Sequence, residues 1–146
     1  EFAREFVKYG VKPEIEVFDA GMINNALALI RKGLLQLPLH FDFVMGVPGG
    51  IPATVKNLLH LVESLPDGST WTVAGIGKHE LYLGVMAIIL GGHVRVGFED
   101  NVYYSRSILA ESNAQLVARI ARIAGELGRE VAKPDEARKI LGLQPA

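Results

Sequence analysis

Apolar positions recur along the chain with two different spacings. Short runs typical of β-strands lie at residues 13–19, 41–46, 70–76 and 93–101, and after each one the apolar residues return every three or four positions. A period of two indicates strands, and a period near 3.6 indicates amphipathic helices. The helical stripes are Leu27, Ile30 and Leu34; Val55, Leu58, Leu59 and Val62; Leu81, Val85 and Ile88; and Leu116, Ile120, Ile123 and Leu127. The pattern therefore predicts four strand–helix units in series.

The ends of the chain add shorter elements to these units. Residues 1–6 have the spacing of an amphipathic helix, and a further short helix is expected after Pro134. Gly128 is the expected C-cap of the helix over residues 113–127. Because no linker or low-complexity segment interrupts the series, residues 1–146 are predicted to form a single domain.

Strands that alternate with helices predict an α/β fold, because parallel strands need a crossover helix between them. A closed (β/α)8 barrel, the TIM barrel, usually takes about 250 residues. Four units in 146 residues therefore form either an open four-stranded sheet or about half of such a barrel, followed by a C-terminal helix.

Charged residues at alternate strand positions favour the half-barrel. Arg95, Gly97 and Glu99 are predicted to share one face of their strand, as are Glu14 and Glu16. In an open sheet covered on both sides, that face would bury charge beneath helices. In a barrel it points into the lumen, whose C-terminal mouth binds ligands. The intervening apolar residues are expected to face the outer helices: Ile15, Val17, Val94, Val96 and Phe98.

The composition of the chain argues against some classes of binding partner. Fifteen basic and sixteen acidic residues give no electrostatic case for binding nucleic acid or an anionic membrane. The chain has no cysteine, which rules out disulfides and thiolate metal sites and suits a cytoplasmic enzyme. No apolar stretch reaches membrane-spanning length, and the first residues resemble a helix more than a signal peptide.

Five blocks of sequence, in order, resemble one enzyme family. They are KPEIEVFDAGM (12–22), GVPGGIPAT (46–54), TWTVAGIGKHEL (70–81), GGHVRVGFEDN (91–101) and the segment 112–143. Together they are similar to the C-terminal half of the β-keto acid cleavage enzymes, typified by 3-keto-5-aminohexanoate cleavage enzyme. The resemblance implies a (β/α)8 barrel in which a divalent metal, usually zinc, assists the condensation of a β-keto acid with acetyl-CoA, giving acetoacetate and a new acyl-CoA.

The resemblance also assigns roles around its RVG-x-ED motif. It implies that Glu99 completes a metal site with two histidines, that Asp100 is the general base and that Arg95 assists at the reacting centre. These residue types agree with the chemistry. A carboxylate is an acceptable zinc ligand beside imidazoles, and a metal that polarises the keto group acidifies the adjacent CH2 for a neighbouring base.

The other parts of the family's site are missing from this sequence. The family's His-x-His metal ligands, and its substrate-binding serine and threonine, lie in its N-terminal half. The four histidines here do not have His-x-His spacing; they are His40, His60, His79 and His93. We therefore expect the chain to be an excerpt that is inactive alone, whose metal is held mostly by ligands outside it. The identity of the β-keto acid is not predicted.

The carboxylates and the arginine also have structural explanations. Glu99 and Asp100 could form a solvated strand end, although the block match favours the functional interpretation. Arg95 could be an ion-pair partner of Glu16 or Glu14 across the lumen. No catalytic role is assigned to Glu16.

The glycines and histidines are weaker candidates for binding. Gly49 and Gly50 could bind a CoA phosphate or a substrate carboxylate through backbone N–H groups, but a tight strand-to-helix turn needs the same glycines. His79 is expected near the barrel mouth and is a candidate for contact with substrate. The other expected places are structural: His93 at the start of its strand, His40 and His60 at the surface or packed on helices, and Trp71 in the core.

Two other functions remain open at this point. The chain could belong to a different metal-assisted barrel enzyme, such as an aldolase- or enolase-like proton abstractor, or it could be a non-enzymatic half-barrel. A half-barrel leaves two strand edges open, so an isolated chain should dimerise or aggregate. A homo-oligomer is therefore expected.

Overall fold

The computed structural model describes residues 1–143 as alternating helices and strands. None of the helices in this part of the chain is long and apolar enough to cross a membrane. The elements in chain order are α1 (Phe2–Tyr9), β1 (Glu14–Val17), α2 (Ala20–Arg31), β2 (His40–Met45), α3 (Val55–Glu63), β3 (Thr70–Gly75), the 3-10 turn η1 (Gly77–His79), α4 (Glu80–Leu90), β4 (His93–Arg95), β5 (Tyr103–Ser105), β6 (Ile108–Leu109), α5 (Asn113–Glu126) and α6 (Pro134–Leu141).

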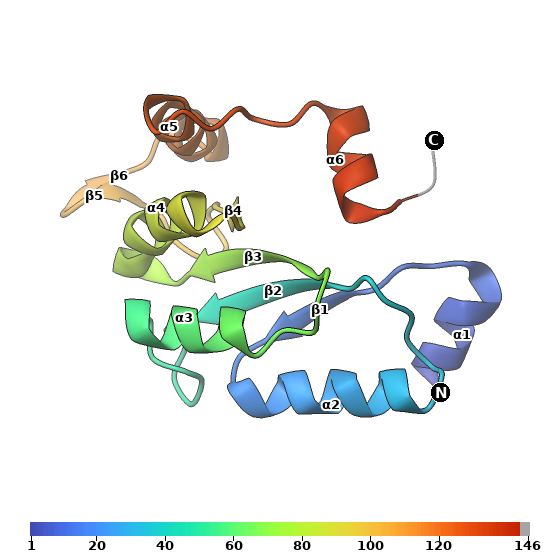
Figure 1. Cartoon of the computed structure of the whole chain (residues 1–146). Helices are drawn as coiled ribbons and strands as arrows, with labels where there is room; N and C mark the ends of the chain where they lie inside the picture. Colours follow the sequence, from blue (N-terminus) through green and yellow to red (C-terminus); the bar gives the residue numbers. More distant parts are fainter. Residues whose placement is uncertain (144–146) are drawn as a thin grey trace.

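The first four strands form one parallel sheet in the order β1-β2-β3-β4. The four predicted strand–helix units are therefore confirmed, as are the short helices near both ends. In Figure 1 the strands begin on the side of α1 and α6 and point toward the β5–β6 hairpin. Lys12 Nζ donates a hydrogen bond to Leu141 O at 2.5 Å, which joins α6 to the segment before β1.

The hydrophobic core lies between the helices and one face of the sheet. Phe41 and Phe43 of β2 and Val73 of β3 are fully buried there, against Leu58 and Leu61 of α3. Trp71 stacks on Phe43 with 5.7 Å between ring centroids, so its predicted place in the core is confirmed. Gly92 is required at this position, because a Cβ there would lie 2.3 Å from the indole ring.

The strand predicted over residues 93–101 is wrong beyond Arg95. The chain turns instead, and the N–H groups of Asp100 and Asn101 both donate to the Gly97 carbonyl, at 3.0 and 2.9 Å. These hydrogen bonds within the turn replace a strand ladder, so the inferred alternation does not reach Glu99. Phe98 consequently is 40% exposed and is not packed beneath the helices.

Candidate active site

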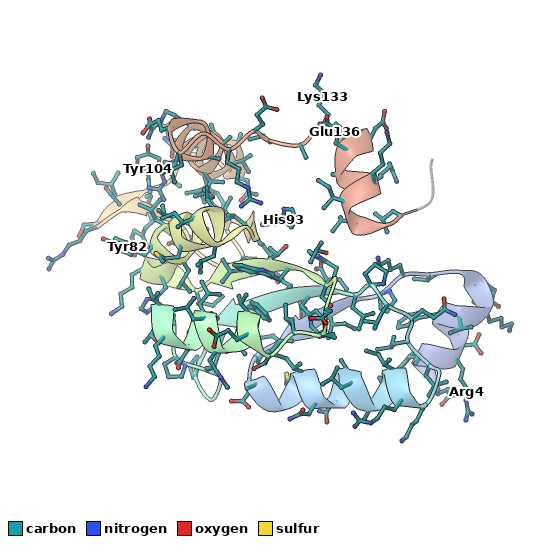
Figure 2. The ribbon with its side chains drawn as sticks, in the orientation of Figure 1. Arg4, Tyr82, His93, Tyr104, Lys133 and Glu136 are labelled. Carbon is teal, nitrogen blue, oxygen red and sulfur yellow. The ribbon has the colours of Figure 1, made fainter. Side chains whose placement is uncertain are left out.

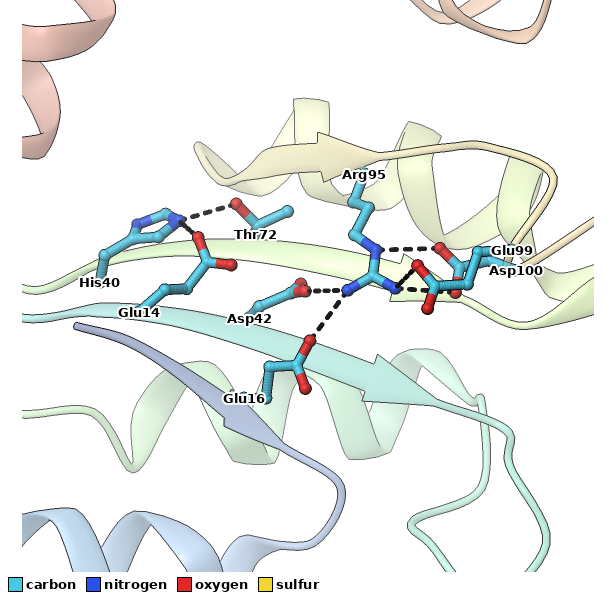
Figure 3. Close-up of polar contacts among 8 residues, drawn as sticks. All are labelled: Glu14, Glu16, His40, Asp42, Thr72, Arg95, Glu99 and Asp100. Atoms are coloured by element: carbon cyan, nitrogen blue, oxygen red, sulfur yellow. Dashed lines mark hydrogen bonds and ion pairs between the residues drawn. The ribbon is translucent and has the colours of Figure 1, made fainter. Parts of the chain in front are cut away.

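Polar side chains cover the face of the sheet opposite the core. Strand register places Glu14, His40 and Thr70 in one row, and Glu16, Asp42, Thr72 and His93 in the next. Arg95 follows one step nearer the carboxyl ends, paired with Ala74. Figure 3 shows six of these side chains on the same side of the sheet, which is the lumen face that the half-barrel prediction requires: Glu14, Glu16, His40, Asp42, Thr72 and Arg95.

The Arg95 guanidinium is the centre of this cluster and contacts four carboxylates. It donates to both oxygens of Asp100, from Nε at 3.0 Å and from Nη2 at 3.1 Å. Nη1 donates to Asp42 at 2.9 Å and to Glu16 at 3.0 Å, and Nη2 donates to Glu99 at 3.0 Å. Burial alone would lower the pKa of Arg95, but the charges of Asp100 and Asp42 outweigh it and raise that pKa, so Arg95 stays protonated.

The environments of Asp100 and Glu99 are the reverse of those predicted. The Asp100 side chain, expected at the rim, is only 4% exposed, whereas that of Glu99 is 84% exposed. The turn after β4 explains the difference, because it directs Asp100 back onto Arg95 and leaves Glu99 facing out. The Asp100 carbonyl accepts a hydrogen bond from Gly77 N at 2.8 Å, which ties this turn to the end of β3.

Asp42 is a member of the cluster that sequence reasoning missed. Its side chain is 1% exposed; Oδ2 is bonded to Arg95, whereas Oδ1 has no hydrogen-bond partner within residues 1–143. Burial raises the pKa of Asp42 to about 6, against the opposing effect of Arg95. A carboxylate between two phenylalanines, in the run Phe41-Asp42-Phe43, was the available signal, because a buried charge needs a partner.

Glu80 is a second residue that sequence reasoning missed, and it stabilises the turn after β4. The carboxylate of Glu80, at the start of α4, is buried and accepts hydrogen bonds from Gly97 N at 3.1 Å and Asn101 Nδ2 at 3.0 Å. Arg119 Nη2 lies 3.9 Å from the same carboxylate. Glu80 thereby holds both ends of the turn that carries Glu99 and Asp100.

His40 is buried in β2, so its predicted place at the surface or on a helix is wrong. Its Nδ1 lies 2.8 Å from Thr70 Oγ1, and its Nε2 lies 3.0 Å from Thr72 Oγ1 and 3.2 Å from Glu14 Oε2. Burial, together with the His93 and Lys12 charges, lowers the pKa of His40 to about 4. In the neutral imidazole with its proton on Nε2, Nε2 donates a hydrogen bond to the Glu14 carboxylate, which can only accept. Nδ1 then accepts a hydrogen bond from the Thr70 hydroxyl.

The structure also shows which of the two predicted partners, Glu14 or Glu16, pairs with Arg95. Glu16 pairs with Arg95, whereas Glu14 pairs with His40. His93 lies on the same face at the start of β4, with 6.0 Å between its ring centroid and that of His40. Burial and the Arg129 charge lower the pKa of His93. These histidines lie at the opposite end of the sheet from Glu99.

Of the weaker candidates, the structure favours the turn interpretation for Gly50. Its N–H donates to Val47 O at 3.1 Å, and a Cβ at Gly50 would lie 2.8 Å from Val47 Cγ2. Gly49 has a φ of +83°, which favours glycine, and open space beside it. His79 ends η1 at the carboxyl side of the sheet, as expected. His60 is exposed on α3. Binding by Gly49 and His79 stays a prediction.

One residue of this cluster, Glu99, is suited to bind a metal ion. Glu99 presents an exposed carboxylate at the carboxyl end of the sheet, which is the kind of oxygen donor that zinc accepts. Within residues 1–143, no three His, Asp or Glu side chains are grouped closely enough to hold a metal ion. A metal ion bound at Glu99 would therefore need further ligands from outside the described residues.

Comparisons with known proteins agree on one family. The sequence model of the beta-keto acid cleavage enzymes matches residues 1–143. The chain is 55% identical over 143 residues to a 3-keto-5-aminohexanoate cleavage enzyme of Fusobacterium nucleatum subsp. nucleatum, covering 98% of this chain and 52% of that protein. It is 42% identical over 144 residues to a 3-oxoadipate:acetyl-CoA acetyltransferase of Cupriavidus necator, covering 97% and 51%. The chain thus spans about half the length of these curated relatives.

A solved structure supports the fold prediction. The apo structure of ObcA superposes with a TM-score of 0.74 at 20% sequence identity, covering 97% of this chain and 39% of that chain. Together with the four parallel strand–helix units and the half-length matches, this confirms the fold as half of a (β/α)8 barrel.

Proposed function

The chain belongs to the beta-keto acid cleavage enzyme family, and from this premise we propose that the protein carrying it condenses a β-keto acid with acetyl-CoA. The products are acetoacetate and a new acyl-CoA. The contact that carries the proposal is the two-point pairing of Arg95 with Asp100, beside the exposed Glu99, at the carboxyl end of the sheet. The names of the matched relatives support it, because they specify keto-acid cleavage and acetyl-CoA-dependent acyl transfer.

Asp100 is the proposed general base. It removes a proton from the CH2 between the keto and carboxylate groups of the substrate, and the resulting carbon nucleophile attacks the thioester carbonyl of acetyl-CoA. The thiolate of CoA then attacks the original keto carbonyl, the bond between that carbon and the former CH2 breaks, and the proton returns to the departing acetoacetate carbon. Atoms balance without any oxidant or reductant.

Arg95 is the proposed partner of that base. Two hydrogen bonds fix the orientation of the Asp100 carboxylate, so its rotamer is set before substrate arrives. The guanidinium also supplies positive charge where tetrahedral oxyanions form. Asp42 and Glu16 hold the other side of Arg95 and limit its movement.

Glu99 is the proposed ligand that this chain gives to a divalent metal, zinc in the first instance. When bound, such a metal acts as a Lewis acid on the substrate keto group. The exposure of Glu99 suits this role, since the carboxylate is accessible to an ion held by further ligands.

Assembly and compartment are further parts of the proposal. Ile108 and Leu109 of β6 are largely exposed apolar residues, which supports a homo-oligomer. Dependence on acetyl-CoA and the absence of cysteine support a cytoplasmic enzyme.

The test uses the full-length protein that contains this chain, loaded with zinc. It is incubated with 3-keto-5-aminohexanoate, then with 3-oxoadipate, each with acetyl-CoA labelled with ¹³C in both acetyl carbons, and products are followed by NMR. We expect acetoacetate labelled only in its acetyl half, formed when both substrates are present. Cleavage that proceeds without acetyl-CoA would instead indicate an aldolase-like lyase. The absence of any turnover with a panel of β-keto acids would contradict the proposal.

A further inference from the structure

An open cleft lies beside the candidate active site, outside the polar face of the sheet. Its walls come from η1 and the start of α4 on one side, and from the β5–β6 hairpin and α5 on the other, and it encloses about 1040 Å³. That is at the upper end of the usual size of small-molecule sites. The cleft is large enough for a nucleotide, and of the roles suggested above only the predicted substrate contact of His79 falls on it.

The cleft is positively charged. Lys78, Arg106 and Arg119 line it, and no aspartate or glutamate is among the lining residues. Arg119 is partly neutralised because it lies 3.9 Å from Glu80. The Lys78 and Arg106 side chains make no hydrogen bond or ion pair with any residue in the described part of the chain, and both are exposed. Two cations are thus available for an anionic ligand.

The same cleft carries exposed aromatic rings. Tyr82 and Tyr103 are 72% and 50% exposed. The Arg119 guanidinium lies 4.3 Å from the centroid of the Tyr104 ring and donates to the Tyr104 carbonyl, so this ring is held in place. Figure 2 shows Tyr82, on α4, and Tyr104, on β5, at the same end of the molecule. Cations beside tyrosine faces suit a base stacked next to phosphates.

The cleft begins beside the proposed base. Asn101, the residue after Asp100, lines it, and Gly77, which donates to the Asp100 carbonyl, lines the opposite wall. Asn101 and Arg106 are five positions apart, so their Cα atoms lie at most about 18 Å from each other. This reach is comparable with an extended pantetheine arm, so one ligand could place phosphates at Arg106 and a thioester near Asp100.

We propose that this cleft binds the adenosine 3′-phosphate 5′-diphosphate end of acetyl-CoA, with Lys78 and Arg106 on the phosphates and tyrosine rings against the adenine. The inference rests on the proposed function, since it places one of that reaction's two substrates. The keto acid binds elsewhere, on the lumen face of the sheet at Arg95 and Glu99, so the two substrates approach Asp100 from different sides.

The test compares acetyl-CoA with acetyl-pantetheine, which has the same thioester but lacks the nucleotide. In the full-length enzyme, Lys78→Gln and Arg106→Gln should each raise the KM for acetyl-CoA about tenfold, as expected for one lost charge-assisted contact. Neither should change kcat/KM for acetyl-pantetheine. The control is Lys56→Gln on α3, which removes an exposed charge away from the cleft and should change neither value.

The outcomes separate this inference from the proposed function. If wild type is inactive with both thioesters, the proposed function itself has failed. If wild type is active and the two variants match the Lys56→Gln control with acetyl-CoA, the cleft proposal is overturned. It is equally overturned if the variants lower activity with both thioesters alike, or if they change the solution mass, because the cleft would then be a structural or subunit contact.

Discussion

At the scale of single residues, one guanidinium organises the candidate site. Arg95 carries one positive charge and contacts four carboxylates, of which Asp42 and Asp100 are almost fully buried. Breaking a buried ion pair by removing one partner typically costs about 3–5 kcal/mol, because the other charge is left uncompensated. Arg95 therefore cannot be replaced without disturbing both the fold and the orientation of Asp100.

The two acids of the motif should fail in different ways when neutralised. Glu99→Gln is expected to lower the zinc content of the full-length enzyme, because the proposed metal ligand is lost. Asp100→Asn is expected to retain zinc and to lower kcat about 10²–10⁴-fold, the usual contribution of a general base. Metal analysis and kcat, measured on the same preparations, check both expectations. Equal zinc content and equal activity in the two variants would contradict the assigned roles.

The members of this cluster could be predicted only in part from sequence. The resemblance pointed to Arg95, Glu99 and Asp100, and the structure brings them into contact. Their exposure was predicted wrongly, because a turn hydrogen-bonded through Gly97 cannot be read from an alternating pattern. Asp42 was missed because its partner is 53 residues away in sequence.

At the scale of elements, β2 places two titratable groups with opposite shifts on one face. His40 and Asp42 are two residues apart, so both point to the lumen side. Burial disfavours the charged form of each, which lowers the pKa of His40 to about 4 and raises that of Asp42 to about 6. His40 and Asp42 therefore change the free energy of unfolding in opposite directions over the same pH range.

The signs follow from proton binding in the folded and unfolded states. His40 binds its proton less readily when folded, so its contribution to stability is present above pH 6.5 and is lost as pH falls through about 4. Asp42 binds its proton more readily when folded, so its contribution is present below pH 3.8 and is lost as pH rises through about 6. In the wild type, these two contributions largely cancel between pH 4 and 6.

A variant that removes one of the two groups should reveal how the other changes the free energy of unfolding with pH. In metal-free full-length protein, Asp42→Asn should make the free energy of unfolding rise more steeply from pH 4 to 6, by about 1–3 kcal/mol over that range relative to wild type. His40→Gln should make it fall instead. Urea unfolding at pH 4, 5, 6 and 7 gives the three profiles. Parallel profiles for wild type and both variants would show that these groups do not titrate as described.

The turn after β4 depends on a helix as well as on its own glycine. Glu80→Gln replaces an oxygen that accepts a hydrogen bond with an NH2 group, facing Gly97 N or Asn101 Nδ2. We expect the free energy of unfolding to fall by about 1–3 kcal/mol. Glu126→Gln is the matched control, because Glu126 pairs with Arg122 at the surface and should change stability by about 0.5 kcal/mol or less. Equal effects of the two substitutions would contradict the supporting role of Glu80.

At the scale of the whole molecule, the described chain is half of a barrel with a polar concave side. Four units of hydrophobic periodicity were enough to predict this class, because each strand and helix carries its own pattern. The β5–β6 hairpin was not predicted, since its two- and three-residue strands are too short to show a period. The predicted strand also began at Phe41, one residue too late, so His40 was placed outside it and its position on the lumen face was missed.

The open edges of the sheet lead to a prediction for the 146-residue chain alone. Within the described residues, β1 and β4 each pair with only one strand. Unpaired strand edges promote association, so sedimentation or light scattering should find a mass above that of the monomer, rising with concentration. A monomer at all concentrations that unfolds in one sharp transition would contradict this expectation.

Proton abstraction by Asp100 can be followed directly, without acetyl-CoA. The zinc-loaded full-length enzyme is placed in D2O with a β-keto acid, and ¹H NMR follows the loss of the CH2 signal beyond the rate without enzyme. We predict that wild type accelerates this exchange and that Asp100→Asn, with its zinc retained, does not. Exchange at the wild-type rate in Asp100→Asn would show that another group is the base and would contradict the account.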